Sequence, residues 1–152
     1  MATRRANVLG LGLIGGSLAL ALKKNGFSVS GSDANSETEK LALDREIISA
    51  IGIDADAEIS FIATPVTAIP AQVQLALKKT KGIVSDVGGV KASVVESISD
   101  PRFVGGHPMA GSELAGLDGA DESLFEGAVW VLTPSGVSSD ETFEKLAKII
   151  GS

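Results

Sequence analysis

The sequence contains no cysteine and only one histidine, His107, among its 152 residues. Without cysteine there is no disulfide framework, no thiolate metal site and no thiol nucleophile, and a single histidine excludes a histidine-rich metal site. Aromatic residues make up only 4% of the chain, so bulky aromatic packing does not dominate its core. The absence of cysteine is typical of a reducing compartment, and we expect a cytoplasmic protein without a bound metal ion.

Basic residues are also scarce, because 13 Lys and Arg stand against 19 Asp and Glu and give a formal net charge of -6. A general binder of nucleic-acid backbones needs clustered cations that displace counterions, so we do not expect nucleic acid as a partner. The apolar run 6–22 follows Arg4 and Arg5 as in a signal peptide. This run is interrupted by glycines and is shorter than the roughly 20 apolar residues that span a bilayer, so we expect no membrane partner.

Glycine is abundant instead, with 18 residues, and short apolar runs alternate along the chain with patterns of helical spacing. The patterns predict strands over 7–9, 27–32, 59–63, 82–86, 102–105 and 128–132, and helices over 13–24, 36–44, 66–79 and 90–97. Strands that alternate with helices indicate an α/β fold, with a Rossmann-like, doubly wound, mostly parallel sheet and helices on both faces. A chain of this length buries one core, and we expect a single domain over residues 1–152.

A last helix is predicted near the C-terminus, where Ser138 and Glu141 stand at the spacing of a capping box. Apolar side chains then recur at helical intervals, at Phe143, Leu146, Ala147 and Ile150. The segment 105–119 is unusually rich in glycine for a connection between elements. Long loops of that kind are often functional.

Gly10, Gly12 and Gly15 match the G-x-G-x-x-G fingerprint of dinucleotide-binding folds. In this fingerprint the first glycine makes a tight turn, the second lets the backbone approach a pyrophosphate, and the third packs the following helix on the strand. The predicted helix begins with Leu13 and Ile14, and the free N–H groups and positive dipole of a helix N-terminus attract phosphate. The motif is weak by itself, but a strand before it and a helix after it predict that these residues hold a dinucleotide.

Asp33 ends the next predicted strand, about 20 residues after the glycines. A carboxylate at this position accepts hydrogen bonds from both hydroxyls of the adenosine ribose and repels a 2′-phosphate. We therefore expect NAD as the cofactor, and not NADP. The alternative, in which Asp33 serves only as a turn or cap residue, stays open at this point.

Four segments of the sequence form a distinctive set. They are Gly-Leu-Ile-Gly-Gly-Ser at 12–17, Ala-Thr-Pro-Val at 63–66, Ser-Asp-Val-Gly-Gly-Val-Lys at 85–91 and Gly-Gly-His-Pro-Met-Ala-Gly-Ser-Glu at 105–113. In this order they resemble the prephenate and arogenate dehydrogenases over nearly the whole chain. The resemblance implies NAD-dependent oxidative decarboxylation of a small cyclohexadienyl acid, prephenate or arogenate, in tyrosine biosynthesis.

The same resemblance implies roles for particular residues. It assigns His107 to the ring hydroxyl of the substrate as the catalytic base, a role that suits imidazole because imidazole titrates near neutral pH. It also implies that Ser112 and Glu113 belong to the substrate pocket and that Thr64 and Pro65 lie beside the cofactor. Thr64 and Pro65 follow a predicted strand, and the carboxyl ends of strands are where open α/β sheets bind ligands.

Pro108 keeps His107 out of helical geometry, so we expect a rigid loop to present the imidazole. The sequence departs from the family pattern at Gly89, where many members carry a serine hydroxyl for the substrate oxygen or the histidine. Family members continue into a C-terminal helical domain that supplies the dimer interface and cations for substrate carboxylates, and we expect the 152 residues to be without it, whether they are a natural length or a truncation. Lys91 is assigned no role.

Several alternatives stay open. The chain fits a stand-alone NAD-binding or regulatory module without catalysis, or another Rossmann-type dehydrogenase of small acids. The choice between prephenate and arogenate is also open, and so is a homodimer formed through the last helix.

Overall fold

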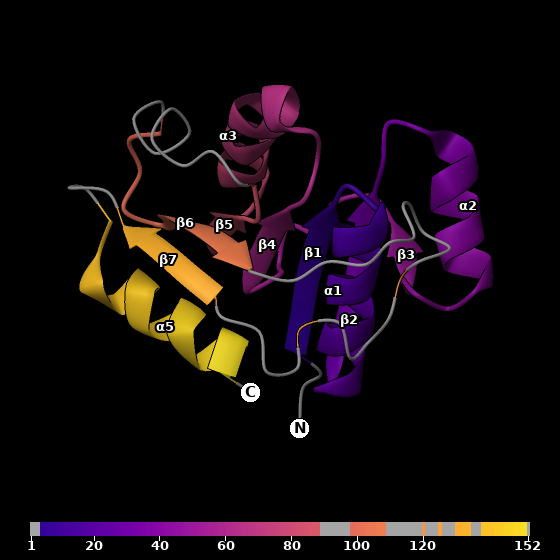
Figure 1. Cartoon of the computed structure of the whole chain (residues 1–152), viewed down its shortest axis with the longest axis horizontal. Helices are drawn as coiled ribbons and strands as arrows, with labels where there is room; N and C mark the ends of the chain where they lie inside the picture. Colours follow the sequence, from indigo (N-terminus) through magenta and orange to yellow (C-terminus); the bar gives the residue numbers. More distant parts are fainter. Residues whose placement is uncertain are drawn as a thin grey trace.

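The computed structural model describes residues 4–88, 98–108, 120, 125, 130–134 and 138–151 of the chain. Its strands are β1 (Arg4–Leu9), β2 (Phe27–Ser32), β3 (Ala50–Ile51), β4 (Ile59–Ile62), β5 (Ile83–Asp86), β6 (Phe103–Pro108) and β7 (Trp130–Pro134). Its helices are α1 (Leu13–Lys24), α2 (Ser36–Asp44), the 3₁₀ turn η1 (Val66–Ala68), α3 (Ile69–Lys79) and α5 (Asp140–Gly151). Figure 1 shows α1 lying across β1 and β2, and α5 beside β7.

These strands form one sheet in the order β3-β2-β1-β4-β5-β6-β7. Neighbouring strands are parallel except β6 and β7, which run antiparallel. Because β1 pairs with both β2 and β4, the carboxyl ends of these strands meet at one edge. The predicted Rossmann-like, mostly parallel sheet is confirmed. The short strand β3 escapes prediction because its two exposed residues, Ala50 and Ile51, show no alternating pattern.

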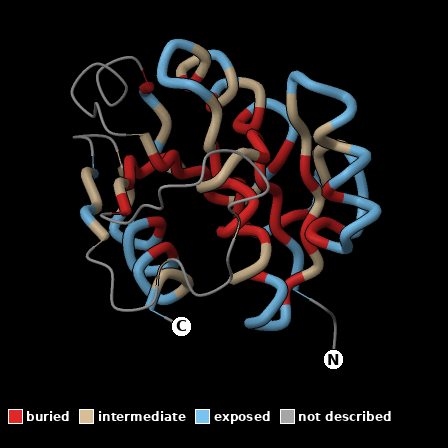
Figure 2. Tube along the Cα trace, turned by 45° about the vertical axis from the view of Figure 1, so that its right-hand side comes forward, coloured by how far each residue is buried: buried red, intermediate tan, exposed pale blue. Residues whose placement is uncertain are grey.

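Two apolar clusters cover the two faces of this sheet. Successive residues of a strand point to opposite faces, so Phe61 of β4 joins the cluster of α1, whereas Ile62 joins the cluster of α3. Leu146 of α5 belongs to the first cluster and Val73 of α3 to the second. Figure 2 shows buried residues along the central strands and exposed residues on the outer sides of the helices. Helices therefore lie on both faces, as predicted.

Helices α1 and α2 and strand β2 have the predicted bounds, and the other elements differ in detail. The first strand is longer than predicted, because the exposed residues Arg4 and Arg5 also pair with β2. The predicted helix over 66–79 is a 3₁₀ turn followed by α3, which begins at Ile69. Pro70 lies in the first turn of α3, where a missing N–H leaves no helical hydrogen bond unmade.

The predicted strand over 102–105 is wrong at both ends, because β6 begins at Phe103 and continues to Pro108. Glycine is a weak strand former, which makes this segment resemble a loop in the sequence. In the structure, β7 pairs antiparallel with the second half of β6 and holds it in the sheet. The strand predicted over 128–132 is β7 at 130–134, and residues 128 and 129 lie outside the described residues. The predicted helix over 90–97 lies outside them too.

The predicted capping box of the last helix is wrong by one residue. The cap of α5 is Ser139, whose Oγ accepts a hydrogen bond from the N–H of Thr142 at 3.1 Å. The hydroxyl of Ser138 instead donates to the carbonyl oxygen of Phe103 at 2.6 Å. This bond ties the start of α5 to β6, so a tertiary contact selects which serine caps the helix.

The apolar stripe predicted on this helix is only partly buried. Leu146 is buried in the core, whereas Phe143 is 37% exposed and Ala147 is exposed as well. Ile150 is half-buried. The helix therefore packs on the sheet through a narrower face than the sequence periodicity indicates.

Arg102 ends helix α3 through its guanidinium group. Nη1 donates to the carbonyl oxygens of Thr80 at 2.7 Å and Gly82 at 3.2 Å, and Nη2 donates to that of Leu77 at 2.6 Å. Carbonyl groups at a helix C-terminus have no partner within the helix. Arg102 supplies these partners and holds α3 against the start of β6.

Replacing Arg102 with Ala should lower the free energy of unfolding by about 2 kcal/mol, because hydrogen bonds from a charged donor contribute about 1.5–3 kcal/mol. Urea unfolding followed by the fluorescence of Trp130, which is the only tryptophan, measures the loss. Lys79→Ala, at an exposed position in the last turn of the same helix, is the matched control. It should change the free energy by less than about 0.5 kcal/mol. Equal losses in the two variants would contradict this role of Arg102.

Candidate functional site

The glycine turn after β1 is closed by backbone contacts. The N–H of Gly10 donates to the carbonyl oxygen of Ser32 at 2.8 Å and joins the ends of β1 and β2. Gly10 has a φ of +96°, and a Cβ there would lie 2.5 Å from the carbonyl oxygen of Ala63. A Cβ on Gly15 would lie 1.7 Å from the carbonyl oxygen of Gly10. Neither glycine leaves room for a side chain, so the backbone of the glycine turn is in direct contact with the backbone after β4 and with the first turn of α1.

Gly12 differs from the other two glycines because it faces open space. A Cβ on Gly12 would meet no heavy atom within 4 Å. Gly12 is also the N-cap of α1, where no side chain accepts a hydrogen bond, and the first turn of this helix contains no acidic residue. Uncapped N–H groups and the positive end of the helix dipole favour an anion such as phosphate.

The carboxylate of Asp33, directly after β2, is held by backbone donors. Oδ2 accepts the N–H of Leu11 in the glycine turn at 2.8 Å, and Oδ1 accepts the N–H of Asn35 at 2.9 Å. Asp33 is therefore a turn residue as well as a candidate for ligand binding. Each carboxylate oxygen has room for a second hydrogen bond, so the group is fixed in place and still able to accept donors from a ligand.

A cleft of about 740 Å³ opens along this carboxyl edge of the sheet. Every residue that the sequence predicts to contact the dinucleotide lines this cleft, except Gly15, which is buried beneath the turn. Sequence reasoning missed other lining residues, namely Ser32, Ala34, Ala63, Thr67, Ala68 and Gln72. Ala63 stands in the segment 63–66 without an assigned role, and no motif marks the other five residues. They reach the cleft because strand pairing brings the ends of β1, β2 and β4 together.

Thr64 and Pro65 follow β4 and form part of the cleft wall. The Oγ1 hydroxyl of Thr64 is buried and has no hydrogen-bond partner among the residues that the structure describes. A buried hydroxyl without a partner costs about 1–3 kcal/mol. A polar ligand in the cleft would remove this cost, so the wall fits a ligand that forms hydrogen bonds.

His107 lies on strand β6, opposite Val131 of β7, so the loop predicted for it is wrong. In the register of β5 with β6, Ser85 pairs with Val104, which places His107 beyond the end of β5 and at the carboxyl edge. Successive residues of a strand point to opposite faces of the sheet, so the imidazole of His107 lies on the face opposite to the one that a side chain at position 106 would face. Nδ1 of the imidazole is buried and has no partner within the described part of the chain. His107 and Asp33 therefore lie at the same edge of the sheet, several strands apart.

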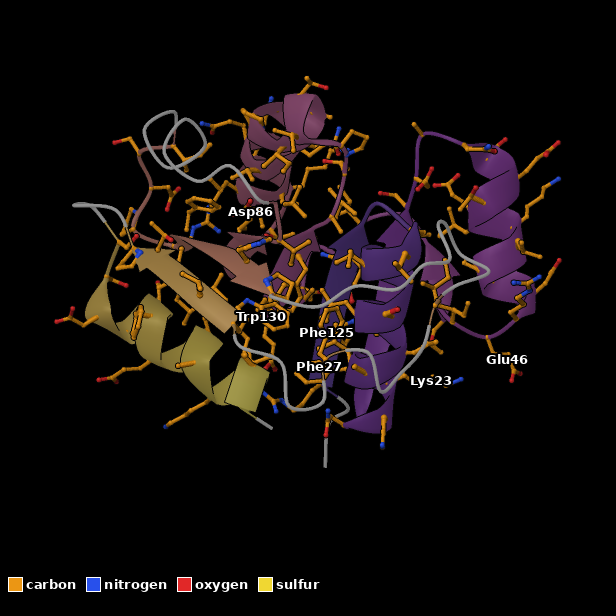
Figure 3. All side chains as sticks on the ribbon, viewed as in Figure 1. Lys23, Phe27, Glu46, Asp86, Phe125 and Trp130 are labelled. Carbon is orange, nitrogen blue, oxygen red and sulfur yellow. The ribbon has the colours of Figure 1, made fainter. Side chains whose placement is uncertain are left out.

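Asp86, the last residue of β5, is a site residue that sequence reasoning missed. Its side chain is fully buried, and Figure 3 shows it directly below α3 in that view. Oδ2 accepts the N–H of Gly88 at 3.0 Å, and Oδ1 accepts the N–H of Gly106 at 3.2 Å. Because Gly106 precedes His107, this carboxylate fixes the backbone that carries the imidazole. A carboxylate at the end of an apolar strand is the signal that could have identified it.

The remaining candidate residues fall outside the described part of the chain. These are the predicted substrate residues Ser112 and Glu113, together with Gly89 and Lys91. Within the described residues, no group of His, Asp and Glu side chains could hold a metal ion. No helix among those same residues is both long enough and apolar enough to span a membrane.

A smaller cavity of about 210 Å³ lies on the face of the sheet that α1 covers, among α1, β7 and α5. Aromatic rings form much of its wall. Figure 3 shows Phe125 and Trp130, whose ring centroids are 5.2 Å apart. The ring centroid of Phe61 lies 6.4 Å from that of Trp130. None of the predicted site residues lines this cavity. The larger cleft, which has the glycine turn and the helix N-terminus, is therefore the candidate site.

Comparison with known proteins adds independent findings. Residues 18–152 match the family model described as prephenate dehydrogenase, nucleotide-binding domain. The prephenate dehydrogenase of Bacillus subtilis (strain 168) is 37% identical over 159 aligned residues, which cover 93% of this chain and 42% of that protein. The family match begins after the glycine turn.

Two solved structures are similar in both fold and sequence. Synechocystis arogenate dehydrogenase has a TM-score of 0.87 and 33% identity, covering 97% of this chain and 56% of its own. Prephenate dehydrogenase from A. aeolicus, solved in complex with hydroxyphenyl propionate and NAD+, has a TM-score of 0.90 and 25% identity, covering 99% and 57%. The chain thus spans about half the length of the proteins that it matches.

Gly12 and Gly15 should respond differently to substitution by Ala. Gly15→Ala should lower the free energy of unfolding by more than about 2 kcal/mol, because its Cβ would overlap the carbonyl oxygen of Gly10. Gly12→Ala should cost less than about 1 kcal/mol, the cost of Ala at a helix N-cap. Urea unfolding of both variants measures the difference. Similar losses in the two variants would show that Gly12 does not face open space.

Proposed function

This chain belongs to the family of prephenate dehydrogenase nucleotide-binding domains, and from that membership we propose that it binds NAD in the cleft at the carboxyl edge of its sheet. The observation that carries the proposal is the open face of Gly12 at the N-terminus of α1, next to the fixed carboxylate of Asp33. Residues 1–152 then form one dinucleotide-binding domain.

In this proposal the pyrophosphate lies against Gly12 and the first turn of α1, where Leu13 and Ile14 line the cleft. Gly10 and Gly15 give the turn its shape, because neither position has room for a Cβ. The uncapped N–H groups supply donors, and the helix dipole supplies favourable charge. The buried hydroxyl of Thr64 gains a partner from the bound dinucleotide, and Pro65 forms part of the apolar wall.

The adenosine ribose lies against Asp33, whose carboxylate accepts hydrogen bonds from the 2′- and 3′-hydroxyls. A 2′-phosphate at the same place would bring two negative groups together, and no Lys or Arg lines the cleft among the described residues to offset the repulsion. We therefore propose NAD as the cofactor in preference to NADP.

The reaction that we propose is oxidative decarboxylation of prephenate or arogenate, a step of tyrosine biosynthesis. NAD bound in the cleft supplies the hydride acceptor. His107 takes the proton of the ring hydroxyl, which favours loss of the hydride from the same carbon. Loss of carbon dioxide then makes the ring aromatic and yields hydroxyphenylpyruvate from prephenate or tyrosine from arogenate.

Three further residues have a role in this proposal besides His107. Asp86 holds the backbone before His107 through Gly106, so the imidazole keeps a fixed direction. Ser112 and Glu113 complete the substrate pocket.

Calorimetric titration with NAD and NADP tests the whole proposal, when it is followed by addition of prephenate or arogenate and by absorbance readings of reduced cofactor. Binding without turnover would leave an NAD-binding module, and no binding would refute the cofactor site.

Asp33→Ala should weaken NAD binding and lower the preference for NAD over NADP by about tenfold, which corresponds to about 1.4 kcal/mol of lost discrimination. Calorimetry with each cofactor gives the ratio of the two affinities. Asp33 also holds Leu11 and Asn35, so an equal loss for both cofactors would mean only that the turn has loosened. Asp44→Ala, an exposed carboxylate at the end of α2, is the control and should leave the ratio unchanged.

His107→Asn should leave the affinity for NAD within about twofold, because His107 does not line the cleft. Turnover should fall by about 10² to 10⁴, the usual contribution of a general base. Steady-state assays with prephenate and arogenate measure the loss. The control is Val131→Ala, which changes the exposed residue paired with His107 across the strands. A similar loss in the control would assign the effect to the strand and not to the imidazole.

A further inference from the structure

Gln72 of α3 is the only side-chain amide among the described residues that line the cleft. It is half-buried, and it makes no side-chain hydrogen bond to any other described residue. The carboxylate of Asp33, by contrast, is already held by the backbone. The cleft therefore contains one amide with donor and acceptor groups available to a ligand.

The sequence positions of Ala68 and Gln72 explain how the amide reaches the cleft. Residues four apart on a helix lie on the same side, and both residues line the cleft. Ile69 and Val73 lie on a different side of α3 and are buried in the apolar cluster between this helix and the sheet. The packing of α3 on the sheet therefore fixes the direction of Gln72, and the amide is presented by a rigid element.

The cleft corresponds to the adenosine and pyrophosphate part of the proposed NAD site. Its described lining comes from the ends of β1, β2 and β4, from the first turn of α1, and from η1 and α3, and none of it comes from β5, β6 or β7. His107 lies on β6, several strands away from Asp33. A dinucleotide with its pyrophosphate at Gly12, its ribose at Asp33 and its reacting ring near His107 leaves the adenine for the part of the cleft that η1 and α3 line.

Adenine matches an amide in hydrogen-bonding pattern. Its 6-amino group is a donor next to the N7 acceptor, and a glutamine amide offers an acceptor and a donor at the same spacing. Ala34, Pro65 and Ala68 offer small apolar surfaces for the faces of the ring. Hypoxanthine carries an oxygen in place of the 6-amino group, so it presents two acceptors at this edge, and one amide cannot satisfy both.

We propose that Gln72 recognises the 6-amino and N7 edge of the adenine ring and makes the site selective for adenine dinucleotides over hypoxanthine dinucleotides. This inference rests on the proposed NAD site and adds a base-specific contact to it. The contact belongs to binding alone, since Gln72 lies far from the reacting ring in this arrangement.

The test is calorimetric titration of the chain with NAD and with nicotinamide hypoxanthine dinucleotide. The unchanged chain should bind NAD about five- to tenfold more tightly, which is the lower end of the discrimination that one bidentate contact provides. Gln72→Ala should bring the two affinities within about twofold of each other. Gln72→Leu retains the size of the side chain and should lose the selectivity in the same way.

Gln74→Ala is the matched control, because Gln74 is an exposed amide on the same helix and does not line the cleft. It should retain the full preference for NAD. Tight NAD binding with a ratio that is unaffected by Gln72→Ala would overturn the role of Gln72 and leave the NAD site standing. Loss of the preference in Gln74→Ala would overturn it too, and failure of the unchanged chain to bind NAD would overturn both proposals.

Discussion

The structure depends on one close contact, in which the turn after β1 meets the backbone after β4 with no side chain between them. Gly10 has positive φ, and the carbonyl oxygen of Ala63 lies 2.5 Å from the position that its Cβ would take. Gly15 brings the first turn of α1 onto the same turn. Because only glycine fits at these two positions, the N-terminus of α1 comes directly to the edge of the sheet, and the cleft forms in front of it.

Two carboxylates secure this edge at different strands. Asp33 holds the glycine turn through the N–H of Leu11, and Asp86 holds β6 through the N–H of Gly106. Both act on backbone groups, so they fix the positions of loops and strands and not only of single side chains. The cofactor half and the histidine half of the proposed site are therefore each organised by one acidic residue at a strand end.

The sequence predicts well where structure is local. The bounds of α1, α2 and β2 agree with the pattern because hydrophobic spacing acts within a few residues, as does Gly26, which follows the C-cap of α1 with a φ of +91°. The prediction fails where distant segments compete. Pairing with β7 keeps the glycines of β6 in the sheet, and the bond from Ser138 to Phe103 leaves Ser139 to cap α5.

The candidate site divides in the same way. The sequence by itself determined the glycine turn and placed Asp33 at the end of the next strand, because both depend on residue type and short-range spacing. Only the tertiary structure decided that Gln72 shares a cleft with Asp33, and that His107 lies in a strand at the same edge. The physical reason is that hydrogen bonds between parallel strands set the register, and their partners are far apart in the chain.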